Sequence, residues 1–177
     1  MIRFKRAESI AELKQILELQ RKNLPSNLSD GTMKVEGFVT VHHTLELLKE
    51  MNDACAHFIA LNDGEVIGYA LCMHPKFKEE IDVLRPMFRQ IEQYHKADDY
   101  IVMGQICIDK QFRKKGIFRK LYEEMLSGIQ PEFSTIITEV DFENTRSLNA
   151  HYAIGFTSIC EYQSHDRNWA LIKLEAS

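Results

Sequence analysis

Apolar and polar positions along the chain follow two different periods, one typical of strands and one typical of helices. Residues 1–6 alternate with a period of two, which predicts a strand. Residues 10–24 then place their apolar side chains at helical spacing. Ser9 and Glu12 form a capping box before this stretch, because each side chain can satisfy a backbone donor of the other residue. The chain is therefore expected to begin with a strand and a capped helix.

The next segment carries loop, helix and hairpin signals in turn. Residues 25–37 are rich in Ser, Asn, Asp and Gly and predict a loop, and residues 40–51 predict a helix with one apolar face. Two apolar runs, at 58–61 and 66–73, flank Asp63-Gly64. This dipeptide tolerates the positive φ angles of a tight turn, so the two runs predict a β-hairpin.

The second half of the chain alternates between helices and strands. Residues 76–96 carry a helical stripe that Pro86 interrupts, which predicts a kink or two short helices that meet at the proline. The remaining apolar runs predict strands at 100–108, 135–140, 157–162 and 169–174, a helix from Gly116 to Pro131, and a helix at 145–154 that Gly155 stops. The order β-α-α-β-β-α-β-α-β-α-β-β predicts a single α/β domain over residues 1–177, with helices flanking a mixed sheet.

Composition narrows the class of protein without selecting a partner. The 177 residues carry 22 Lys and Arg against 26 Asp and Glu, a net charge of −4, which favours neither nucleic acid nor an anionic membrane. No apolar run approaches the ~20 residues of a membrane helix, and the first residues do not resemble a signal peptide. The four cysteines form no CxxC pair, and the seven histidines form no metal-ligand pattern. We therefore expect a cytoplasmic, metal-free domain without nucleic acid or membrane as partner.

The segment from Ile106 to Leu121 holds the clearest chemical signal. A buried strand runs into a short basic loop with one glycine, Gly116, and then into an amphipathic helix. The first N–H groups of a helix have no intrahelical partner and lie at the positive end of its dipole, so this corner is suited to bind phosphate. The same residues also fit a solvated helix start whose basic side chains face water. The pattern alone does not decide between the two interpretations.

Two motifs resemble those of the GNAT superfamily of N-acetyltransferases. Residues 113–117, Arg-Lys-Lys-Gly-Ile, are similar to the acyl-CoA pyrophosphate loop R/Q-x-x-G-x-G/A, although Phe118 stands where the family prefers Gly or Ala. We expect the Phe118 ring to turn into the core while its N–H still serves the ligand. Residues 144–156 resemble the downstream motif N-x-x-A/S-x-x-x-Y-x-x-x-G-F, and the order of elements agrees across nearly the whole chain.

The resemblance implies a GNAT-like acyl-CoA N-acyltransferase fold and an acetyl-CoA-dependent N-acetyltransferase, which transfers an acetyl group to a primary amine by direct attack in a ternary complex. Backbone groups of the central strand would pair with the pantetheine arm, and the loop amides would hold the pyrophosphate. The cofactor-binding residues that the resemblance implies are Ile106, Cys107, Ile108, Arg113, Lys114, Lys115, Gly116, Ile117, Phe118 and Asn144. Asn144 fits a plain helix N-cap equally well.

The catalytic groups follow less directly from the motifs. The family usually protonates the departing thiolate with a Tyr seven residues after the Asn, and this count falls on His151, with Tyr152 one position away. Adjacent helical positions point about 100° apart, so only one of the two can face the thioester. For the general base, Gln105 cannot accept a proton, and Glu139 and Asp141 are alternatives that we expect to form a solvated strand end. The base is therefore unassigned.

Departures from the family pattern leave other interpretations open. Residues 74–98 form a helical insertion between the third and fourth strands, which either walls one side of the acceptor cleft or is buried against a second subunit as a homodimer. A non-catalytic acyl-CoA-binding module is the alternative function, motivated by Phe118 and the missing base. Nucleic-acid binding through the basic cluster at 110–120 is a third hypothesis, although the phosphates of one CoA explain that cluster equally well. His42 and His43 receive no role.

Overall fold

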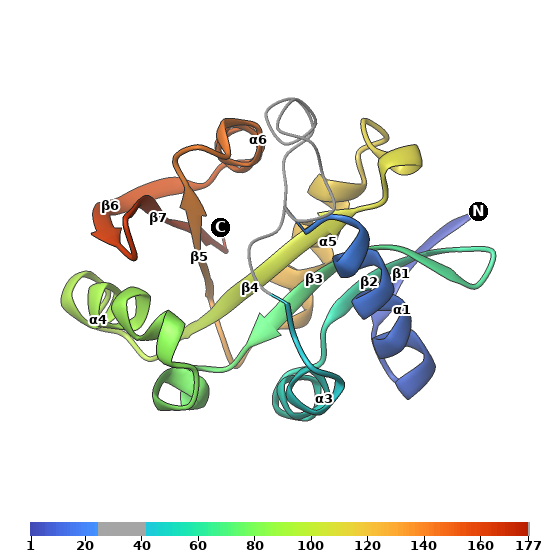
Figure 1. Cartoon of the computed structure of the whole chain (residues 1–177), viewed down its shortest axis with the longest axis horizontal. Helices are drawn as coiled ribbons and strands as arrows, with labels where there is room; N and C mark the ends of the chain where they lie inside the picture. The colour runs from blue at the N-terminus through green and yellow to red at the C-terminus, as the bar shows by residue number, and fades with distance from the viewer. Residues whose placement is uncertain (25–41, 177) are drawn as a thin grey trace.

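The computed structural model of the chain describes residues 1–24 and 42–176, which form a seven-stranded mixed sheet with helices on both faces (Figure 1). The strand order is β1-β2-β3-β4-β5-β7-β6, in which β4 and β5 are parallel and the other neighbours are antiparallel. The strands are β1 (Ile2–Arg6), β2 (Phe58–Asn62), β3 (Glu65–Met73), β4 (Tyr100–Ile108), β5 (Thr135–Asp141), β6 (Thr157–Ser164) and β7 (Arg167–Glu175). The predicted fold class is confirmed.

The helices form two layers, because each buries one apolar face against the sheet. The first layer holds α1 (Ile10–Lys22), α3 (Leu45–Ala54) and α4 (Arg85–Tyr94), and the second holds α5 (Ile117–Gly128) and α6 (Thr145–Ala153) (Figure 1). Fully buried side chains include Leu13, Ile16, Leu48, Met51 and Ile91 in the first layer and Ile117, Leu121 and Met125 in the second. Each of these contributes roughly 1.5–3 kcal/mol of hydrophobic stabilisation.

Local signals in the sequence set several of the element boundaries. The Ser9 hydroxyl accepts from the Glu12 amide at 3.2 Å, and the Glu12 carboxylate accepts from the Ser9 amide at 3.0 Å, so the predicted capping box starts α1. Asp63 and Gly64, with φ angles of 49° and 88°, form the predicted tight turn between β2 and β3. Gly155 ends α6 with a φ of 109°.

One helix start differs from the prediction, and the structure decides between the two alternatives predicted at Pro86. The helix predicted at 40–51 begins at Leu45 instead, because the Thr44 hydroxyl accepts from the Leu47 amide at 3.2 Å and caps α3. The first two residues of that predicted helix, and the loop predicted at 25–37, lie outside the described residues. Pro86 does not kink a helix: it occupies the first turn of α4, where the missing N–H has no intrahelical partner to lose.

The insertion before β4 is built from two short 3₁₀ helices, η2 (Pro75–Glu79) and η3 (Asp82–Leu84), followed by α4. Its apolar residues Phe77 and Phe88 are buried in the core of the same chain, and α4 packs against β6. Because η3 ends where α4 begins, short helices meet beside Pro86, which confirms the second of the two alternatives predicted there. A homodimer stays a prediction.

The strands β4 and β5 diverge halfway along their length (Figure 1). Their register pairs Tyr100–Val102 with Thr135–Ile137 and ends there. At the point of divergence, the Thr138 hydroxyl donates to the Met103 carbonyl at 2.8 Å. Beyond it, one edge of β4 has no strand beside it among the described residues, and this edge positions the candidate site.

Candidate active site

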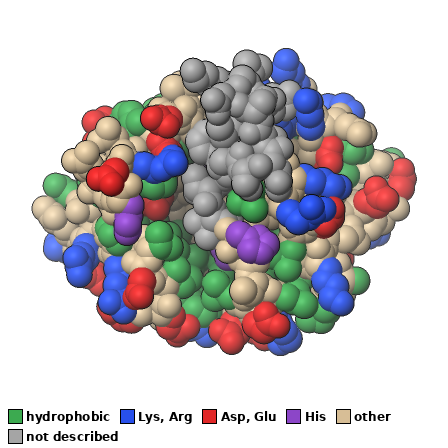
Figure 2. Space-filling model, viewed as in Figure 1, with side chains coloured by type: hydrophobic (Ala, Val, Ile, Leu, Met, Phe, Trp, Pro, Cys, Tyr) green, Lys and Arg blue, Asp and Glu red, His purple; other side chains and the backbone are tan. Residues whose placement is uncertain are grey.

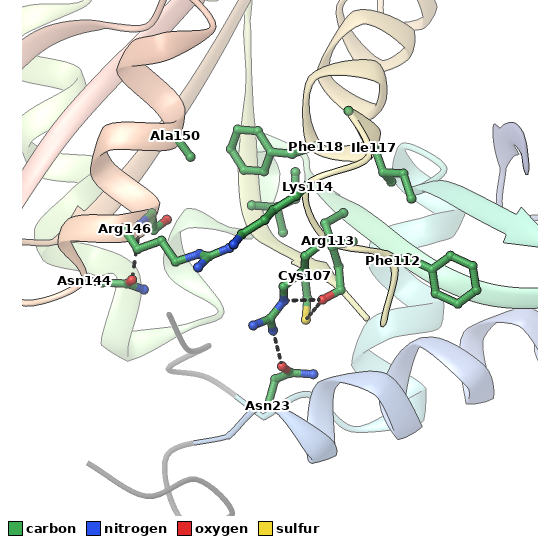
Figure 3. Close-up of a pocket in the computed structure, with 14 residues that line it drawn as sticks. Asn23, Cys107, Phe112, Arg113, Lys114, Ile117, Phe118, Asn144, Arg146 and Ala150 are labelled. Atoms are coloured by element: carbon green, nitrogen blue, oxygen red, sulfur yellow. Dashed lines mark hydrogen bonds between the residues drawn. The ribbon is translucent and has the colours of Figure 1, made fainter. Parts of the chain in front are cut away.

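A cavity of about 210 Å³ lies beside the end of β4, between the loop before α5 and the start of α6 (Figure 3). Nine of the ten residues predicted to bind the cofactor line it, and Lys115 is the exception. Five further lining residues were not predicted as site residues: Asn23, Phe112, Arg146, Ser147 and Ala150. The structure therefore brings the predicted residues together, and their binding of a cofactor stays a prediction.

Among the described residues, no strand pairs with the edge of β4 that borders this cavity, so we call it the open edge of β4. On the other edge, Ile106 lies opposite Ala70 and Cys107 opposite Tyr69 in the antiparallel pairing with β3. Because β5 has already diverged, the residues Ile106–Ile108 border the cavity instead of a neighbouring strand. An extended arm that carries amide groups can pair with such an edge as an added strand. Burial raises the pKa of the Cys107 thiol to about 12, so this lining group is neutral.

The loop before α5 brings the start of that helix to the cavity. Lys114 and Gly116 adopt left-handed backbone conformations, with φ angles of 61° and 78°. Gly116 is the N-cap, and among the described residues no side chain caps α5. Gly116, Ile117 and Phe118 line the cavity. The uncapped amides and the helix dipole therefore make this corner suited to an anion, which is the first of the two interpretations that the sequence leaves open.

Arg113 braces this loop instead of reaching into solvent. Its Nε donates to the Ile108 carbonyl at 3.0 Å, and its Nη2 donates to the Asn23 side-chain oxygen at 2.8 Å (Figure 3). Asn23 is the C-cap of α1. The guanidinium thus fastens the loop to the end of β4 and to the end of α1.

The two lysines that follow point in different directions. Lys114 lines the cavity and extends toward Arg146 of α6 (Figure 3). Lys115 turns away, so that its Nζ lies 4.8 Å from the centre of the Phe112 ring. Lys and Arg side chains also gather on the outer surface near this loop, at the upper right of Figure 2. Lys114 and Arg146 therefore bring positive charge to the cavity from the loop and from α6.

Phe118, which departs from the family motif, and Asn144, which also fits a plain N-cap, both line the cavity. The Phe118 ring packs edge-on against Tyr122 and His151, with centroids 5.2 and 5.0 Å apart, while the residue still lines the cavity. The ring therefore packs against the core as predicted, and the contact of the Phe118 N–H with a ligand stays a prediction. Asn144 caps α6, because its side-chain oxygen accepts from the Ser147 amide at 3.4 Å, and it also lines the cavity. The N-cap interpretation is therefore confirmed without removing Asn144 from the site.

A second cavity, of about 70 Å³, opens between the diverging strands and shares Ile106, Asn144 and Ser147 with the first. Its walls come from β4, β5, β7 and α6. The lining residues that are titratable or can form side-chain hydrogen bonds include Gln105, Thr138, Glu139, Asp141, His151 and Trp169. The two cavities therefore meet beside the open edge of β4.

The carboxylate of Glu139 lies in the wall of the second cavity, and its surroundings differ from the solvated strand end that the sequence predicted. We expected Glu139 and Asp141 to form a solvated strand end, but burial raises the pKa of Glu139 to about 7 and Asp141 is 3% exposed. Asp141 forms an ion pair with Arg167, and Glu139 accepts a hydrogen bond from the Tyr162 hydroxyl. A signal for this burial exists in the sequence, since Glu139 is a charge inside the apolar run at 135–140.

Gln105 is held in the wall of the second cavity by a buried network. Its side-chain oxygen accepts from the Tyr69 hydroxyl at 2.7 Å and from the Gln20 amide at 2.6 Å. The Gln20 oxygen accepts from the His43 backbone N–H at 2.8 Å, and the Gln20 amide lies 2.8 Å from His43 Nδ1. His43, to which the sequence analysis assigned no role, therefore helps to position Gln105.

His151 and Tyr152, the predicted proton donors, occupy different environments. His151 is buried in the wall of the second cavity, and burial lowers its pKa to about 4. Its Nδ1 lies 2.7 Å from the Ser147 carbonyl, which identifies Nδ1 as the protonated nitrogen, and Nε2 accepts from the Tyr122 hydroxyl at 2.7 Å. Tyr152 is 41% exposed and lines neither cavity. The proton-donor role stays a prediction for both.

Within residues 1–24 and 42–176, no three His, Cys, Asp or Glu side chains gather as a group that could hold a metal ion. In the same part of the chain, no helix has the length and apolar character required to cross a bilayer.

The family described as Acetyltransferase (GNAT) family matches residues 13–156 of the chain. This match covers most of the sequence, including both motifs and the strands that separate to form the site. The chain therefore belongs to the GNAT acetyltransferase family. No curated protein matches it.

Solved structures with the same fold cover nearly the whole chain at low sequence identity. The ribosomal-protein-S18-alanine N-acetyltransferase from Escherichia coli is 12% identical, with a TM-score of 0.65 over 99% of this chain and 94% of its own. The NatC complex bound to Gag peptide and CoA gives 17% identity and a TM-score of 0.67, covering 99% of each chain. The structure of yncA from Salmonella typhimurium with its cofactor acetyl-CoA is 13% identical, with a TM-score of 0.65 over 99% of this chain and 94% of its own. At these identities the likeness establishes the fold.

Proposed function

We propose that the chain is an acetyl-CoA-dependent N-acetyltransferase that transfers an acetyl group to a primary amine by direct attack in a ternary complex. The observation that carries this proposal is that two cavities meet beside Ile106. One has an anion-binding helix start and an open strand edge, and the other holds a carboxylate whose pKa burial raises to about 7. Membership of the family, and related folds solved with acetyl-CoA or CoA, support an acyl-CoA donor.

The first cavity would hold the donor, which supplies the acetyl group as an activated thioester. The backbone of Ile106–Ile108 would pair with the amide groups of the pantetheine arm. The amides of residues 113–118 would bind the pyrophosphate, with Lys114 and Arg146 adding positive charge from opposite walls. Asn144 would contact the cofactor arm while it caps α6.

The second cavity would receive the acceptor amine, and Glu139 would act as its general base. A primary ammonium must lose a proton before its nitrogen can attack a thioester, and the most effective base has a pKa near the working pH. Burial raises the pKa of Glu139 to about 7, which meets this condition. The proton would pass from the ammonium nitrogen to a Glu139 carboxylate oxygen, and the free amine would then face the donor.

The departing thiolate also needs a proton, and His151 and Tyr152 are the predicted sources. The Nδ1 proton of His151 is held by the Ser147 carbonyl, so its donation requires that this bond opens. A free thiol has a pKa of about 8.5, which makes the thiolate a tolerable leaving group without a dedicated acid.

Release of free CoA in the presence of acetyl-CoA and a panel of primary amines tests the proposal. We expect Glu139→Gln to lower kcat/KM by ~10²–10⁴-fold with unchanged affinity for CoA. Glu161→Gln, on the exposed side of β6, is the matched control and should retain full activity. A wild-type chain that releases no CoA above the uncatalysed rate with any amine would contradict the proposal.

A non-catalytic acyl-CoA-binding module is the second candidate. The bonded ring of His151 and the exposed position of Tyr152 favour it, because neither residue presents an unengaged donor to the donor cavity. This second hypothesis predicts that the chain binds acetyl-CoA but releases no CoA in the same assay.

A further inference from the structure

Tyr162 reaches across one strand of the sheet to the carboxylate of Glu139. Tyr162 lies on β6 opposite Trp169 of β7, and Trp169 lies opposite Asp141 of β5. The Tyr162 side chain therefore passes diagonally over β7, and its hydroxyl donates to Glu139 Oε2. Within the described chain, this is the hydrogen bond that reaches the Glu139 carboxylate.

The other titratable groups around Glu139, as far as the structure describes the chain, each have partners of their own. Asp141, on the same strand, is paired with Arg167 of β7. His151, on α6, is bonded to Tyr122 and to the Ser147 carbonyl. Cys160, on β6, is partly buried and hydrogen-bonds to Gln90 of α4 at 3.8 Å. Tyr162 is thus the neutral donor that is directed at this carboxylate.

We propose that Tyr162 is a positioning residue for the general base, holding the Glu139 carboxylate at the acceptor cavity and stabilising its charged form. This inference rests on the proposed function, in which Glu139 accepts the proton of the acceptor amine. Tyr162 does not line either cavity, so it acts through Glu139 and not by touching the amine.

The chemistry of the pair supports this role. Burial and the neighbouring Glu139 raise the pKa of Tyr162 far above its usual value, so the hydroxyl carries its proton at any working pH. Its hydrogen bond lowers the pKa of Glu139, against the larger effect of burial, which raises it. Without Tyr162, burial would act unopposed, and more of the Glu139 population would be protonated and unable to act as a base at neutral pH.

The pH dependence of kcat/KM in Tyr162→Phe tests the inference. We expect the acid limb to move upward by about one pH unit, since a hydrogen bond to a charged group contributes about that much. At neutral pH the rate should fall several-fold, and above the limb it should return toward the wild-type rate with an unchanged KM for acetyl-CoA. Tyr94→Phe, at a 54% exposed position of α4, is the matched control and should leave the limb in place.

A ¹³C titration of the Glu139 carboxyl group, assigned with Glu139→Gln, gives a readout that is independent of turnover. The inference requires the pKa of Glu139 to rise in folded Tyr162→Phe relative to the wild-type chain. An unchanged pKa, or a rate that falls equally at every pH, would overturn it. If the wild-type chain shows no turnover while the titration shifts as expected, the proposed function fails and the effect of Tyr162 on Glu139 stands. The two failures are therefore distinguishable.

Discussion

The hydroxyl of Tyr122 lies 2.7 Å from Nε2 of His151, and this bond joins α5 to α6 beneath the candidate site. Both rings belong to an aromatic cluster with Phe118 and Phe156, with centroids 5.0 to 5.5 Å apart. Because α5 carries the anion-binding corner and α6 carries Asn144, this contact fixes the distance between the two walls of the donor cavity.

Removal of the His151 ring should therefore destabilise the fold. His151→Ala should lower the free energy of unfolding by about 2–4 kcal/mol, because it leaves a cavity and an unpartnered Tyr122 hydroxyl. Urea unfolding measures this effect, and Tyr152→Ala at an exposed position of the same helix should change the stability by less than about 0.5 kcal/mol. A loss as small as that of the control would contradict the structural role.

The same variant decides the predicted proton-donor role. If His151 protonates the thiolate, kcat of folded His151→Ala falls by ~10²-fold or more while its affinity for CoA is retained. A kcat close to that of the wild-type chain would remove His151 from the catalytic prediction and leave the thiolate to be protonated by water.

Gly116 should be required for cofactor binding because of its backbone conformation. Its φ is 78°, and an added Cβ would meet no atom within 4 Å, so Gly116→Ala introduces backbone strain without a clash. We expect a loss of about 1–2 kcal/mol in stability and a weaker affinity for acetyl-CoA. Gly64, in the β2–β3 turn, has a φ of 88° and equally open space, and it lines neither cavity, so Gly64→Ala is the matched control. It should lose similar stability with unchanged affinity, and equal loss of affinity in both variants would contradict the prediction.

Lys114 and Lys115 offer a matched pair for the electrostatic part of the site. Only Lys114 lines the cavity, whereas Lys115 lies over Phe112. Lys114→Ala should weaken CoA binding by roughly tenfold at low salt, with a smaller effect at high salt, because the contact is partly screened. Lys115→Ala should stay within about twofold of the wild-type affinity. Fluorescence or calorimetric titration at two salt concentrations measures both effects, and equal losses would contradict the assignment.

Acid should destabilise the protein through three buried neutral histidines. Burial lowers the pKa values of His43, His57 and His151 to about 4, so the unfolded chain binds protons before the folded chain does. Stability is therefore fully present above the unfolded pKa of about 6.5 and is lost as pH falls toward 4, at up to about 1.4 kcal/mol per pH unit for each histidine. Glu139 acts in the opposite direction, because its raised pKa stabilises the protonated fold below about 7. Urea unfolding at a series of pH values should show a net loss toward acid, and a flat or rising profile would contradict it.

Local signals in the sequence predicted most of the fold. The Ser9–Glu12 capping box, the Asp63-Gly64 turn and the stop at Gly155 each depend on a few adjacent residues, and each is found where it was predicted. The helix start at Thr44 was missed because a capping hydroxyl within an apolar stretch does not change its periodicity.

The candidate site was predictable where it is contiguous and unpredictable where it is not. Nine of the ten predicted cofactor-binding residues line one cavity, because a strand end and a helix start follow each other in the chain. The buried state of Glu139 depends on the divergence of β4 and β5, and on Tyr162 crossing from β6. The charge inside the apolar run at 135–140 signals the burial of Glu139, but its contact with Tyr162 joins residues far apart in the sequence, so no local pattern reports that contact.

Isothermal titration calorimetry of the full chain with acetyl-CoA tests whether the cavity beside the open edge of β4 holds an acyl-CoA. We expect saturable binding with one acetyl-CoA per chain, weakened in Gly116→Ala and retained in Gly64→Ala. No heat of binding at millimolar acetyl-CoA or CoA would contradict it.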